Sequence, residues 1–431
     1  MGGTSALATI LNSVRVPEIR KKLLFTAAML ALYRLGAYIP APGINVHTID
    51  NISKNFAGSN VLGFLNLFSG GSLSRFAVFA LGIMPYITAS IILQLLQVVV
   101  PSLEKLRKEG EVGQQKITQY TRYLTVALAF FQSIGYVFLF RTFARSEGPG
   151  SSILKGGFTF NRVLVIVLAL TAGTVLLMWF GELITQRGIG NGISLMIFAS
   201  IVARIPNGVQ SWWTNPDQVF KVMMPLLALA VIAAIVFIQE GQRRIPVQYA
   251  KRVVGRRMAG GGQTYLPLRV NMAGVIPVIF AASLMAFPPT IGQLVQSGWA
   301  RDFSNFLNPN GAAYVIGESI LIIVFTYFYT AVTFNPVEQA DNLKKYGGFI
   351  PGVRPGRPTA EFLDRILARL TFPGALYLAA VAALPTILIN QTSANFFFGG
   401  TSILIVIGVA LDTMKQLEAQ LMMRNYEGFL K

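Results

Sequence analysis

The stretch Gly82-Ile83-Met84-Pro85-Tyr86-Ile87-Thr88-Ala89-Ser90 is repeated in outline by Gly274-Val275-Ile276-Pro277-Val278-Ile279-Phe280-Ala281-Ala282-Ser283. In both stretches a glycine stands three residues before a proline, and an isoleucine stands two residues after it. Each stretch lies in the second long hydrophobic segment of its half of the chain, so the repeat indicates two related halves built on interrupted helices. In membrane proteins such interruptions tend to mark the functional path.

The composition places the chain among membrane proteins. It has 431 residues, of which 53% are hydrophobic and 13% are charged, and its mean hydropathy is +0.56. Ordinary soluble domains have about twice that share of charged residues, so we expect a polytopic membrane protein. There is no cysteine, and the single histidine, His47, lies in a polar connector away from possible ligands. We therefore expect no metal site and no cofactor.

Ten apolar runs approach the roughly 20 residues that cross a bilayer as a helix. They are 23–38, 76–99, 123–140, 163–180, 189–203, 222–238, 275–295, 313–334, 370–389 and 396–411. The segment Met1 to Lys22 lacks the pattern of a removable signal peptide. With the N-terminus in the cytoplasm, most of the 36 Lys and Arg residues fall in cytoplasmic segments, which predicts that both termini are cytoplasmic.

The predicted fold is therefore an all-α polytopic membrane protein with two halves. Residues 1–210 would hold the first five spans, and residues 211–431 would hold the other five. The second half carries two long cytoplasmic connectors, at about residues 240–270 and 335–369. A glycine run in the first connector, Gly260 to Gly262, predicts a hairpin tip nearby.

Both connectors are strongly basic. In the second, two Pro-Gly turns between Pro351 and Gly356 place Arg354 at a tip. Such a tip suits docking to RNA phosphates or to an acidic protein surface, while solvated charge without a partner is the alternative. The candidate contact residues in the two connectors are Arg243, Arg244, Lys251, Arg252, Arg256, Arg257, Arg354 and Arg357.

Charges within the spans are few. No acidic residue stands at the centre of a span, whereas ion-coupled transporters usually need one there. Glu318 and Asp412 fall toward span ends. Arg34 is the one clear intramembrane charge, and we expect it to snorkel or to satisfy a neighbouring backbone carbonyl rather than to act in transport.

The sequence does not predict an enzyme. The run Gly192-Ile193-Ser194 is compatible with an intramembrane serine protease, but His47 is predicted on the opposite side of the membrane and cannot serve as its base. There is no His-Glu-x-x-His motif, no P-loop and no dinucleotide-binding turn. Any energy source must therefore come from a partner.

A short segment before the second span, Leu62 to Arg75, is moderately apolar and too short to cross the membrane. It contains the glycine pair Gly70-Gly71, which can act as a hinge. Two structures fit this pattern equally well, a short re-entrant helix and an interfacial helix on the outer surface.

Several motifs resemble those of the SecY family of bacterial protein-conducting channel subunits. The resemblance covers nearly the whole chain, and its motifs occur in the family's order. They are Asn66 to Gly71, Gly82 to Gln97, Gly188 to Ser194, Asn271 to Pro277, Pro351 to Gly356 and Phe398 to Ser402.

The resemblance implies ten helices in two inverted halves around an hourglass pore, with a lateral opening between spans two and seven. It also implies site residues. The constriction ring would be Ile83, Ile87, Ile193, Ile197, Ile279 and Ile405. The plug helix, within 62–75, would include Phe64, Asn66, Phe68, Ser69, Gly70, Gly71 and Arg75. The lateral gate would include Gln94, Gln132 and Asn271. Ordinary helix packing is the alternative role for the ring and gate residues.

The implied function is a passive, gated channel in the bacterial cytoplasmic membrane. It would pass unfolded secretory polypeptides with signal sequences and release transmembrane segments into the lipid, driven by SecA or a translating ribosome. The implied subunit partners are SecE and SecG. Two other classes remain as alternatives, a small-solute secondary transporter with inverted repeats and a scaffold for other membrane proteins. The missing midplane acid and the apolar ring count against the transporter, and the hinged segment counts against the scaffold.

Overall fold

The computed structural model describes residues 16–55, 66, 68–147, 152–214, 218–249, 252–254, 257–259, 263–294, 298, 302–303, 306–307, 311–392 and 400–429. Its contacts divide the chain into two compact units. The first comprises Met1–Ser211, Ser283–Tyr314 and Val409–Lys431, and the second comprises Trp212–Ala282 and Val315–Gly408. The first break along the chain, after Ser211, lies beside the boundary predicted between the halves.

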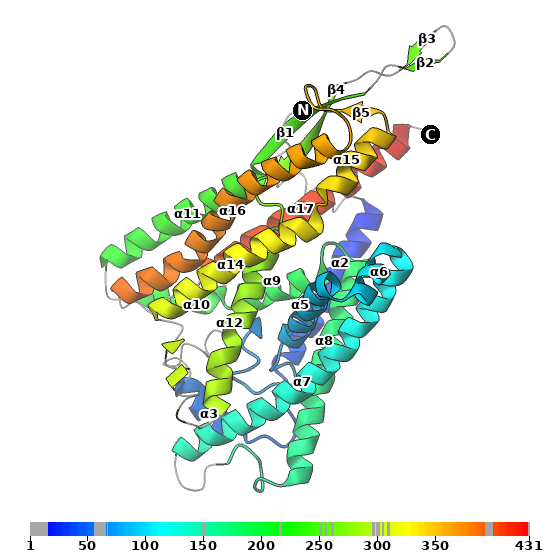
Figure 1. The fold of residues 1–431 in the computed structure, drawn as a ribbon. Coiled ribbons are helices and arrows are strands. Elements are labelled where there is room, and N and C mark those ends of the chain that lie inside the picture. The colour runs from blue at the N-terminus through cyan, green and yellow to red at the C-terminus, as the bar shows by residue number, and fades with distance from the viewer. Residues whose placement is uncertain are drawn as a thin grey trace. The chain divides into compact units, whose positions relative to one another are not determined.

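The first unit is helical (Figure 1). Its helices are α2 (Pro17–Gly36), α3 (Val46–Asn55), α5 (Met84–Val99), α6 (Pro101–Lys108), α7 (Glu111–Glu147), α8 (Phe160–Arg187), α9 (Gly192–Val202) and most of α10 (Ile205–Thr214). Helices α7 and α8 pack along each other, and both also contact α5. Helix α2 packs against α8 and α9. A buried apolar cluster joins α3, α7 and α8 to the irregular segment that precedes α5, and in it the rings of Phe76 and Phe140 meet edge to face at 4.6 Å.

The second unit combines helices with a small antiparallel sheet. Its helices are α11 (Gln218–Glu240), α15 (Pro336–Lys345), α16 (Arg357–Thr392) and parts of α12 (Ile276–Leu294), α14 (Ala312–Thr333) and α17 (Gly400–Phe429). Its strands are β1 (Gln242–Tyr249), β2 (Arg252–Val254), β3 (Arg257–Ala259), β4 (Gln263–Arg269) and β5 (Gly348–Phe349). The sheet order is β4-β1-β5, and β2 pairs with β3 separately. Alternate residues of β1, Ile245 and Val247, point into a core shared with α16.

The predicted hairpin in the first basic connector is confirmed. Strands β1 and β4 pair from Gln242↔Arg269 to Gln248↔Gln263, and β2 pairs with β3 from Arg252↔Ala259 to Val254↔Arg257. Strands β2 and β3 are the outermost described part of this hairpin, as Figure 1 shows.

Each of the ten predicted spans overlaps a helix in the described part of the chain. By length and composition, five helices in the described part of the chain can cross a membrane, or six if the bent pair α5 and α6 counts as one span. Helices α9 and α12 are shorter apolar helices. The start of the second span was predicted wrongly, because residues 76–83 form turns and α5 begins only at Met84.

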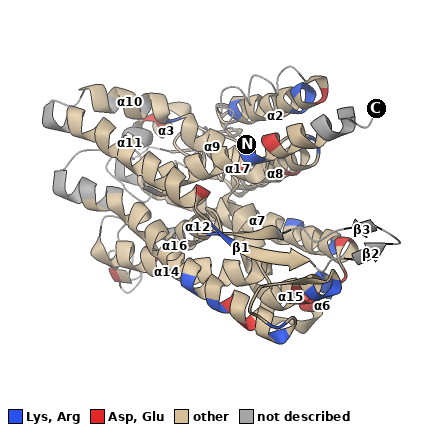
Figure 2. Cartoon of the chain, turned by 90° about the horizontal axis from the view of Figure 1, so that it is seen from above, with Lys and Arg blue, Asp and Glu red and all other residues tan. Residues whose placement is uncertain are grey.

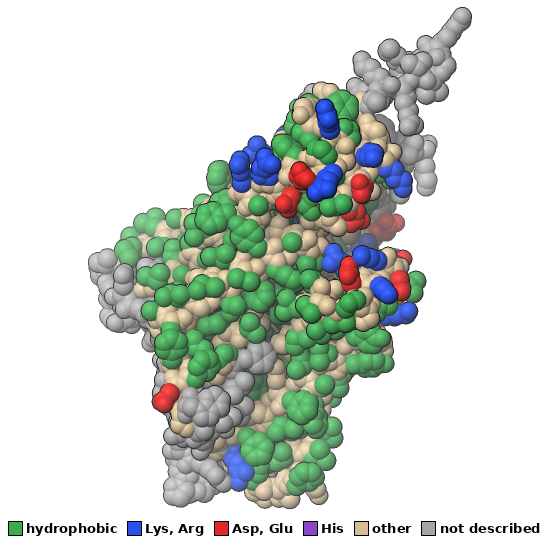
Figure 3. All heavy atoms as spheres, viewed as in Figure 1, with side chains coloured by type: hydrophobic (Ala, Val, Ile, Leu, Met, Phe, Trp, Pro, Cys, Tyr) green, Lys and Arg blue, Asp and Glu red, His purple; other side chains and the backbone are tan. Residues whose placement is uncertain are grey.

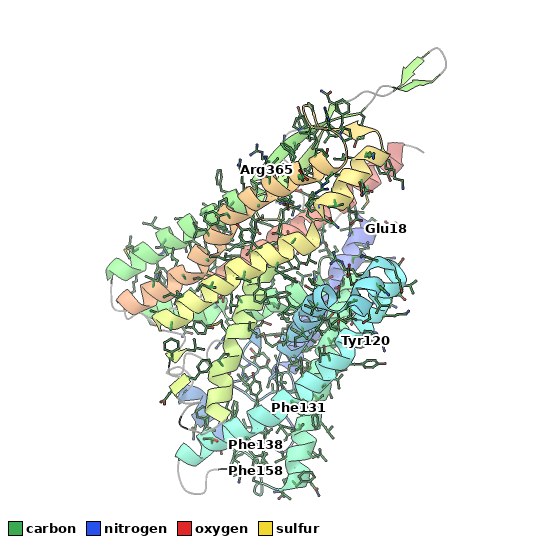
Figure 4. The ribbon with its side chains drawn as sticks, in the orientation of Figure 1. Glu18, Tyr120, Phe131, Phe138, Phe158 and Arg365 are labelled. Atoms are coloured by element: carbon green, nitrogen blue, oxygen red, sulfur yellow. The ribbon has the colours of Figure 1, made fainter. Side chains whose placement is uncertain are left out.

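The outer surfaces of these helices suit a lipid environment. In Figure 3, hydrophobic side chains cover α7 and α14, while charged side chains gather over α6 and α15. On α7 the side chains of Tyr120, Phe131 and Phe138 are exposed and project away from the helix, as labelled in Figure 4. A row of exposed aromatic rings on a long apolar helix is favourable in lipid and unfavourable in water.

One ion pair ties α7 to α8. The guanidinium of Arg122 donates from Nε to Oε1 of Glu182 at 2.9 Å and from Nη2 to Oε2 at 2.7 Å. The side chain of Glu182 is only 13% exposed and that of Arg122 is 38% exposed. This two-pronged geometry is the strongest form of the pair, and the burial of Glu182 makes the loss of its partner costly.

We predict that Arg122→Met lowers the thermal unfolding midpoint of the purified protein in detergent. The carboxylate of Glu182 would remain buried without its partner, at a cost of about 2 kcal/mol. The control is Lys108→Met, which removes the exposed pair of Lys108 with Glu104 and should leave the midpoint unchanged. Equal shifts of the thermal midpoint in the two variants would show that the Arg122–Glu182 pair contributes no more to stability than the exposed Lys108–Glu104 pair.

Candidate functional site

The two repeated stretches form the same local structure. Gly82 and Gly274 both adopt left-handed backbone angles, with φ of 60° and 63°, and in each case a helix begins two residues later. In both helices a proline occupies the second position, where its missing N–H costs nothing. The first backbone bonds also correspond, from Ile87 N to Ile83 O and from Ile279 N to Val275 O. Both stretches therefore mark the start of a helix that follows turns, not a break within a continuous helix, so the repeat is confirmed as shared local structure and the predicted interruption of a helix is wrong.

The described part of the predicted plug is a compact turn structure rather than a continuous helix. Asn66 and Phe68 are helical, and residues 69–76 form turns. The side chain of Asn66 accepts a hydrogen bond from Ser74 N at 3.1 Å, and Ser69 Oγ accepts one from Leu73 N at 3.1 Å. These bonds satisfy backbone donors that a helix would otherwise pair. Residue Phe64 lies outside the described residues.

This segment is buried inside the first unit. Phe68, Ser72 and Leu73 are at most 1% exposed. An interfacial helix would keep one face exposed, so this burial favours the re-entrant alternative. Arg75 is exposed at the end of the segment, and its guanidinium lies 3.9 Å from the ring centroid of Tyr38.

Helix α2 holds the segment through two consecutive carbonyl groups, and Ser200 of α9 bonds one of the two side chains that do so. The hydroxyl of Tyr33 donates to Ser69 O at 3.3 Å and shares a 2.6 Å hydrogen bond with Ser200 Oγ. Arg34 Nη1 donates to Gly70 O at 2.7 Å. The expectation that Arg34 satisfies a backbone carbonyl is thus confirmed.

The sequence alone did not predict a role for Tyr33 or Ser200. The chain separation of 167 residues between them leaves no local pattern that would pair their hydroxyls. The only available signal was indirect. Tyr33 is adjacent to the one intramembrane arginine, and a buried tyrosine hydroxyl usually has a polar partner.

The six predicted ring residues lie in both units. Ile83 precedes α5, Ile87 is on α5, and both Ile193 and Ile197 are on α9 in the first unit. Ile279 is on α12 and Ile405 is on α17 in the second unit. All are buried except Ile193, which is half-buried and packs near Gly181 of α8. Burial fits both helix packing and a closed constriction, so the ring stays a prediction.

Two of the predicted gate residues have unusual hydrogen bonding. Gln94 Nε2 donates to Ser90 Oγ at 3.3 Å, and Asn271 Nδ2 donates to Gly274 O at 2.9 Å. In each side chain the amide oxygen is buried and has no hydrogen-bond partner among the described residues. Gln132 is half-buried on α7. Within the first unit, Ser283 of α12 lies 3.9 Å from the sulfur of Met84 on α5.

Four of the predicted contact arginines, Arg243, Arg244, Arg354 and Arg357, are exposed. Arg243 and Arg244 lie on the exposed end of β1. The turns around Arg354 are confirmed by the positive φ of Gly352 (82°) and Gly356 (100°). Arg357 is exposed and pairs with Glu361 at 3.1 Å. Arg252 and Arg257 lie on β2 and β3, while Lys251 and Arg256 lie outside the described residues.

The sheet joins these exposed residues within the second unit. Strand β5 pairs with β1, and the loop that carries Arg354 follows β5 directly. Helix α15 packs against β5 and α16. Figure 2 shows positively and negatively charged residues along α15 beside this sheet. The described parts of the two connectors therefore form one charged platform built on the sheet and α15.

Comparison with known proteins decides the family. The sequence model of SecY matches residues 77–414. Protein translocase subunit SecY of Mycobacterium tuberculosis strain H37Rv is 51% identical over 441 residues, which is 99% of this chain and 100% of the relative. The chain belongs to the SecY family. The same subunit of Corynebacterium glutamicum is 50% identical over 445 residues, again 99% of this chain and 100% of the relative.

Solved structures agree on the fold of the SecY family. One, described as showing that the plug domain of SecY stabilises the closed state of the translocation channel and maintains a membrane seal, has a TM-score of 0.61 at 18% identity and covers 95% of this chain and 96% of that one. Sec61 in the canine ribosome-channel complex from the endoplasmic reticulum has a TM-score of 0.59 at 18% identity, with the same coverage. The predicted class, a helical polytopic membrane protein, is confirmed.

In the described part of the chain there is no group of three or more His, Asp or Glu side chains that could hold a metal ion. Glu318, the acidic residue of α14, is near the start of that helix and is buried.

We predict that Gly70→Ala lowers the thermal midpoint more than Gly71→Ala. Both glycines have positive φ, so both substitutions carry the same backbone strain of about 1 kcal/mol. At Gly70, however, a Cβ would lie 2.9 Å from Tyr33 Oη and 3.3 Å from Ser200 Cα, whereas at Gly71 it would meet nothing within 4 Å. Equal midpoints would contradict the close packing of the segment on α2 and α9.

Proposed function

We propose that this chain forms the protein-conducting channel of a bacterial translocase. It passes unfolded polypeptides across the cytoplasmic membrane and releases transmembrane segments sideways into the lipid. The observation that carries this proposal is the 51% identity over 99% of the chain to a protein translocase subunit. An identity that spans every helix and connector supports a shared activity better than any single motif does. The full-length match also outweighs the transporter and scaffold alternatives.

The seal is proposed to have two layers. The segment 66–75 acts as the plug, supported by its burial, its compact turns and its anchoring to α2 and α9. The six isoleucines form the second layer, a narrow apolar waist. Branched apolar side chains around a waist exclude water and ions by dewetting, yet they can move apart for an extended polypeptide.

The lateral gate is proposed to use Gln94, Gln132 and Asn271. The buried amide oxygens of Gln94 and Asn271 support this role, because an acceptor without a partner is a high-energy state in an apolar environment. A passing peptide, water or a polar side chain of a neighbouring helix would supply the missing donor. Such a seam opens at low cost, because the polar groups exchange partners rather than lose them.

The exposed platform of the second unit is proposed to dock a cytoplasmic motor. Its contact residues are Arg243, Arg244, Lys251, Arg252, Arg256, Arg257, Arg354 and Arg357. In the solved relative Sec61, the channel forms a complex with a ribosome. We assign SecA or a translating ribosome as the driving partner of this chain, with SecE and SecG as its small membrane subunits. The chain itself is then a passive conduit and performs no catalysis.

The proposed location is the bacterial cytoplasmic membrane, with both termini and the basic connectors on the cytoplasmic side. The charge pattern supports this orientation. Lys and Arg are concentrated in the connectors assigned to the cytoplasm, as the positive-inside rule requires. The N-terminal half, residues 1–210, and the C-terminal half, residues 211–431, would then have inverted topologies.

We predict that Arg354→Glu abolishes ATP-dependent transport of an unfolded, signal-bearing preprotein into proteoliposomes that contain this chain, SecE and SecA. The substitution reverses the charge at an exposed tip, and like charges across an interface oppose docking. The matched control is Lys155→Glu, an equal charge change at an exposed residue on the predicted outer side.

Equal transport by the Arg354 variant and the native chain would remove Arg354 from the docking site. Absence of transport by the native chain, in a preparation where a known channel is active, would overturn the proposed function itself.

We predict that Ile87→Asn raises the ion conductance of proteoliposomes that hold the resting channel. A polar side chain at the waist admits water where a branched apolar one excludes it. The control is Ile91→Asn, one turn further along α5, which also places a polar group at a buried site but outside the ring. Equal conductance of the two variants would exclude Ile87 from the constriction.

A further inference from the structure

The side chains of Tyr33 and Arg34 bind specific main-chain atoms of the plug segment, and Ser200 bonds Tyr33. Tyr33 and Arg34 are neighbours on α2, and they bind the carbonyls of the neighbouring residues Ser69 and Gly70. Both acceptors are main-chain atoms. The helix therefore binds the shape of the turn at Ser69-Gly70 and does not depend on the side chains of the plug.

The segment is also bonded to itself, so it can move as one body. Within it, Ser74 N bonds to the Asn66 side chain, Leu73 N bonds to the Ser69 side chain, and Gly71 N bonds to Asn66 O at 2.9 Å. None of these three bonds involves α2 or α9. Releasing the carbonyls of Ser69 and Gly70 would detach the segment from α2 without unfolding its turns.

The hydroxyl protons of Tyr33 and Ser200 can be rearranged when the plug segment leaves, so that neither hydroxyl loses its hydrogen bond. Tyr33 and Ser200 have one hydroxyl proton each. Besides their mutual contact, two carbonyls lie within reach, Ser69 O for Tyr33 and Met196 O for Ser200, the latter at 2.8 Å. If Tyr33 donates to Ser69 O, Ser200 donates to Tyr33. If the plug is absent, Tyr33 donates to Ser200, and Ser200 donates to Met196 O.

We propose that Tyr33, Arg34 and Ser200 form a latch that holds the plug by two main-chain carbonyls, with Ser200 as the alternative acceptor that keeps the Tyr33 hydroxyl bonded once the plug has left. This inference rests on the proposed role of segment 66–75 as the plug. Arg34 supplies the charge-assisted bond to Gly70 O, and its second nitrogen donates to the Tyr38 hydroxyl at 2.9 Å. The guanidinium thus stays positioned on α2 in both states.

The latch can be tested with a single cysteine, because the chain has none of its own. Ser72 is 0% exposed, and its hydroxyl has no hydrogen-bond partner among the described residues, so Ser72→Cys places a nearly isosteric probe within the held segment. The channel complex, with its small subunits, is reconstituted in proteoliposomes. The rate of modification by a membrane-impermeant maleimide, added to both sides, then reports how often the segment leaves its site.

The three latch variants have different expected effects. Tyr33→Phe and Arg34→Gln each remove a bond to the plug and should raise the labelling rate roughly tenfold. Ser200→Ala should lower the rate, because Tyr33 then has no acceptor in the open state while its bond to Ser69 O remains in the closed state. A double variant of Tyr33→Phe with Ser200→Ala should label as fast as Tyr33→Phe alone. If Ser200 only stabilised the packing around the plug segment, Ser200→Ala would raise the labelling rate instead.

Matched controls are available in the same unit. Tyr136→Phe removes a hydroxyl from another buried tyrosine, and Arg141→Gln removes a guanidinium that contacts Phe158. Neither side chain has a hydrogen bond to the described part of the plug segment, although Tyr136 shares a buried cluster with Leu73, so neither should change the labelling rate. If Tyr33→Phe and Arg34→Gln label like the native chain, or if the controls label as fast as they do, the latch is wrong. Arg34→Lys keeps the charge but has a single donor nitrogen in place of the guanidinium fork. It should give an intermediate labelling rate in a folded protein.

Ion leak through the same liposomes separates the latch from the proposed plug. Faster labelling together with a larger leak supports both. Faster labelling without a leak keeps the latch and overturns the assignment of the segment as a seal. If labelling of the latch variants is unchanged, while a variant in which residues 66–75 are replaced by a Gly-Ser linker leaks ions, the plug is supported and the latch is overturned.

Discussion

Every backbone polar group within a membrane protein needs a partner, because lipid supplies none. This constraint explains the most unusual part of the chain, the turns from residue 69 to 83, which are irregular backbone buried within the first unit. Side chains and neighbouring loops provide the bonds that a helix would have made. Asn66, Ser69, Tyr33 and Arg34 pair the first half of this stretch, while Ala41 N bonds to Phe76 O and Val78 N to Ile39 O in the second half.

The same constraint explains how the two repeated stretches change from turns to helix without loss. A glycine with positive φ ends the preceding turn, and the helix begins two residues later with a proline at its second position, where no backbone donor is needed. A break of this kind leaves few unsatisfied groups and sets the direction in which the new helix starts. Gly82 also packs closely, since a Cβ there would lie 3.2 Å from Ser69 Cα. The turn at Gly82 therefore packs directly against the held segment.

Most of the helical framework could be predicted from sequence, because the apolar runs are long and the connectors are basic. Hydropathy placed the start of the second span too early, at residue 76, because residues 76–83 are as apolar as a span. It does not register that Gly82 adopts a left-handed conformation. The apolar composition of Leu62 to Arg75 also suggested a short helix, whereas the described residues after Phe68 form turns. The residues of the candidate site came from motif resemblance. Tyr33 and Ser200 could not be found in this way, since their pairing exists only when α2 and α9 pack together.

The strength of the proposed latch matches what a gated channel requires. A neutral hydrogen bond contributes about 1 kcal/mol and one to a charged group about 2 kcal/mol, so the bonds from Tyr33 and Arg34 together supply about 3 kcal/mol. A free energy difference of this size changes the closed-to-open ratio about a hundredfold, in addition to what the burial of Phe68 and Leu73 contributes, since each 1.4 kcal/mol changes an equilibrium about tenfold. A much stronger attachment, such as a buried ion pair to the plug, would keep the channel shut against its substrate. Binding of a polypeptide or a motor can readily outweigh two hydrogen bonds, and the Ser200 hydroxyl reduces the cost further by giving Tyr33 a second partner.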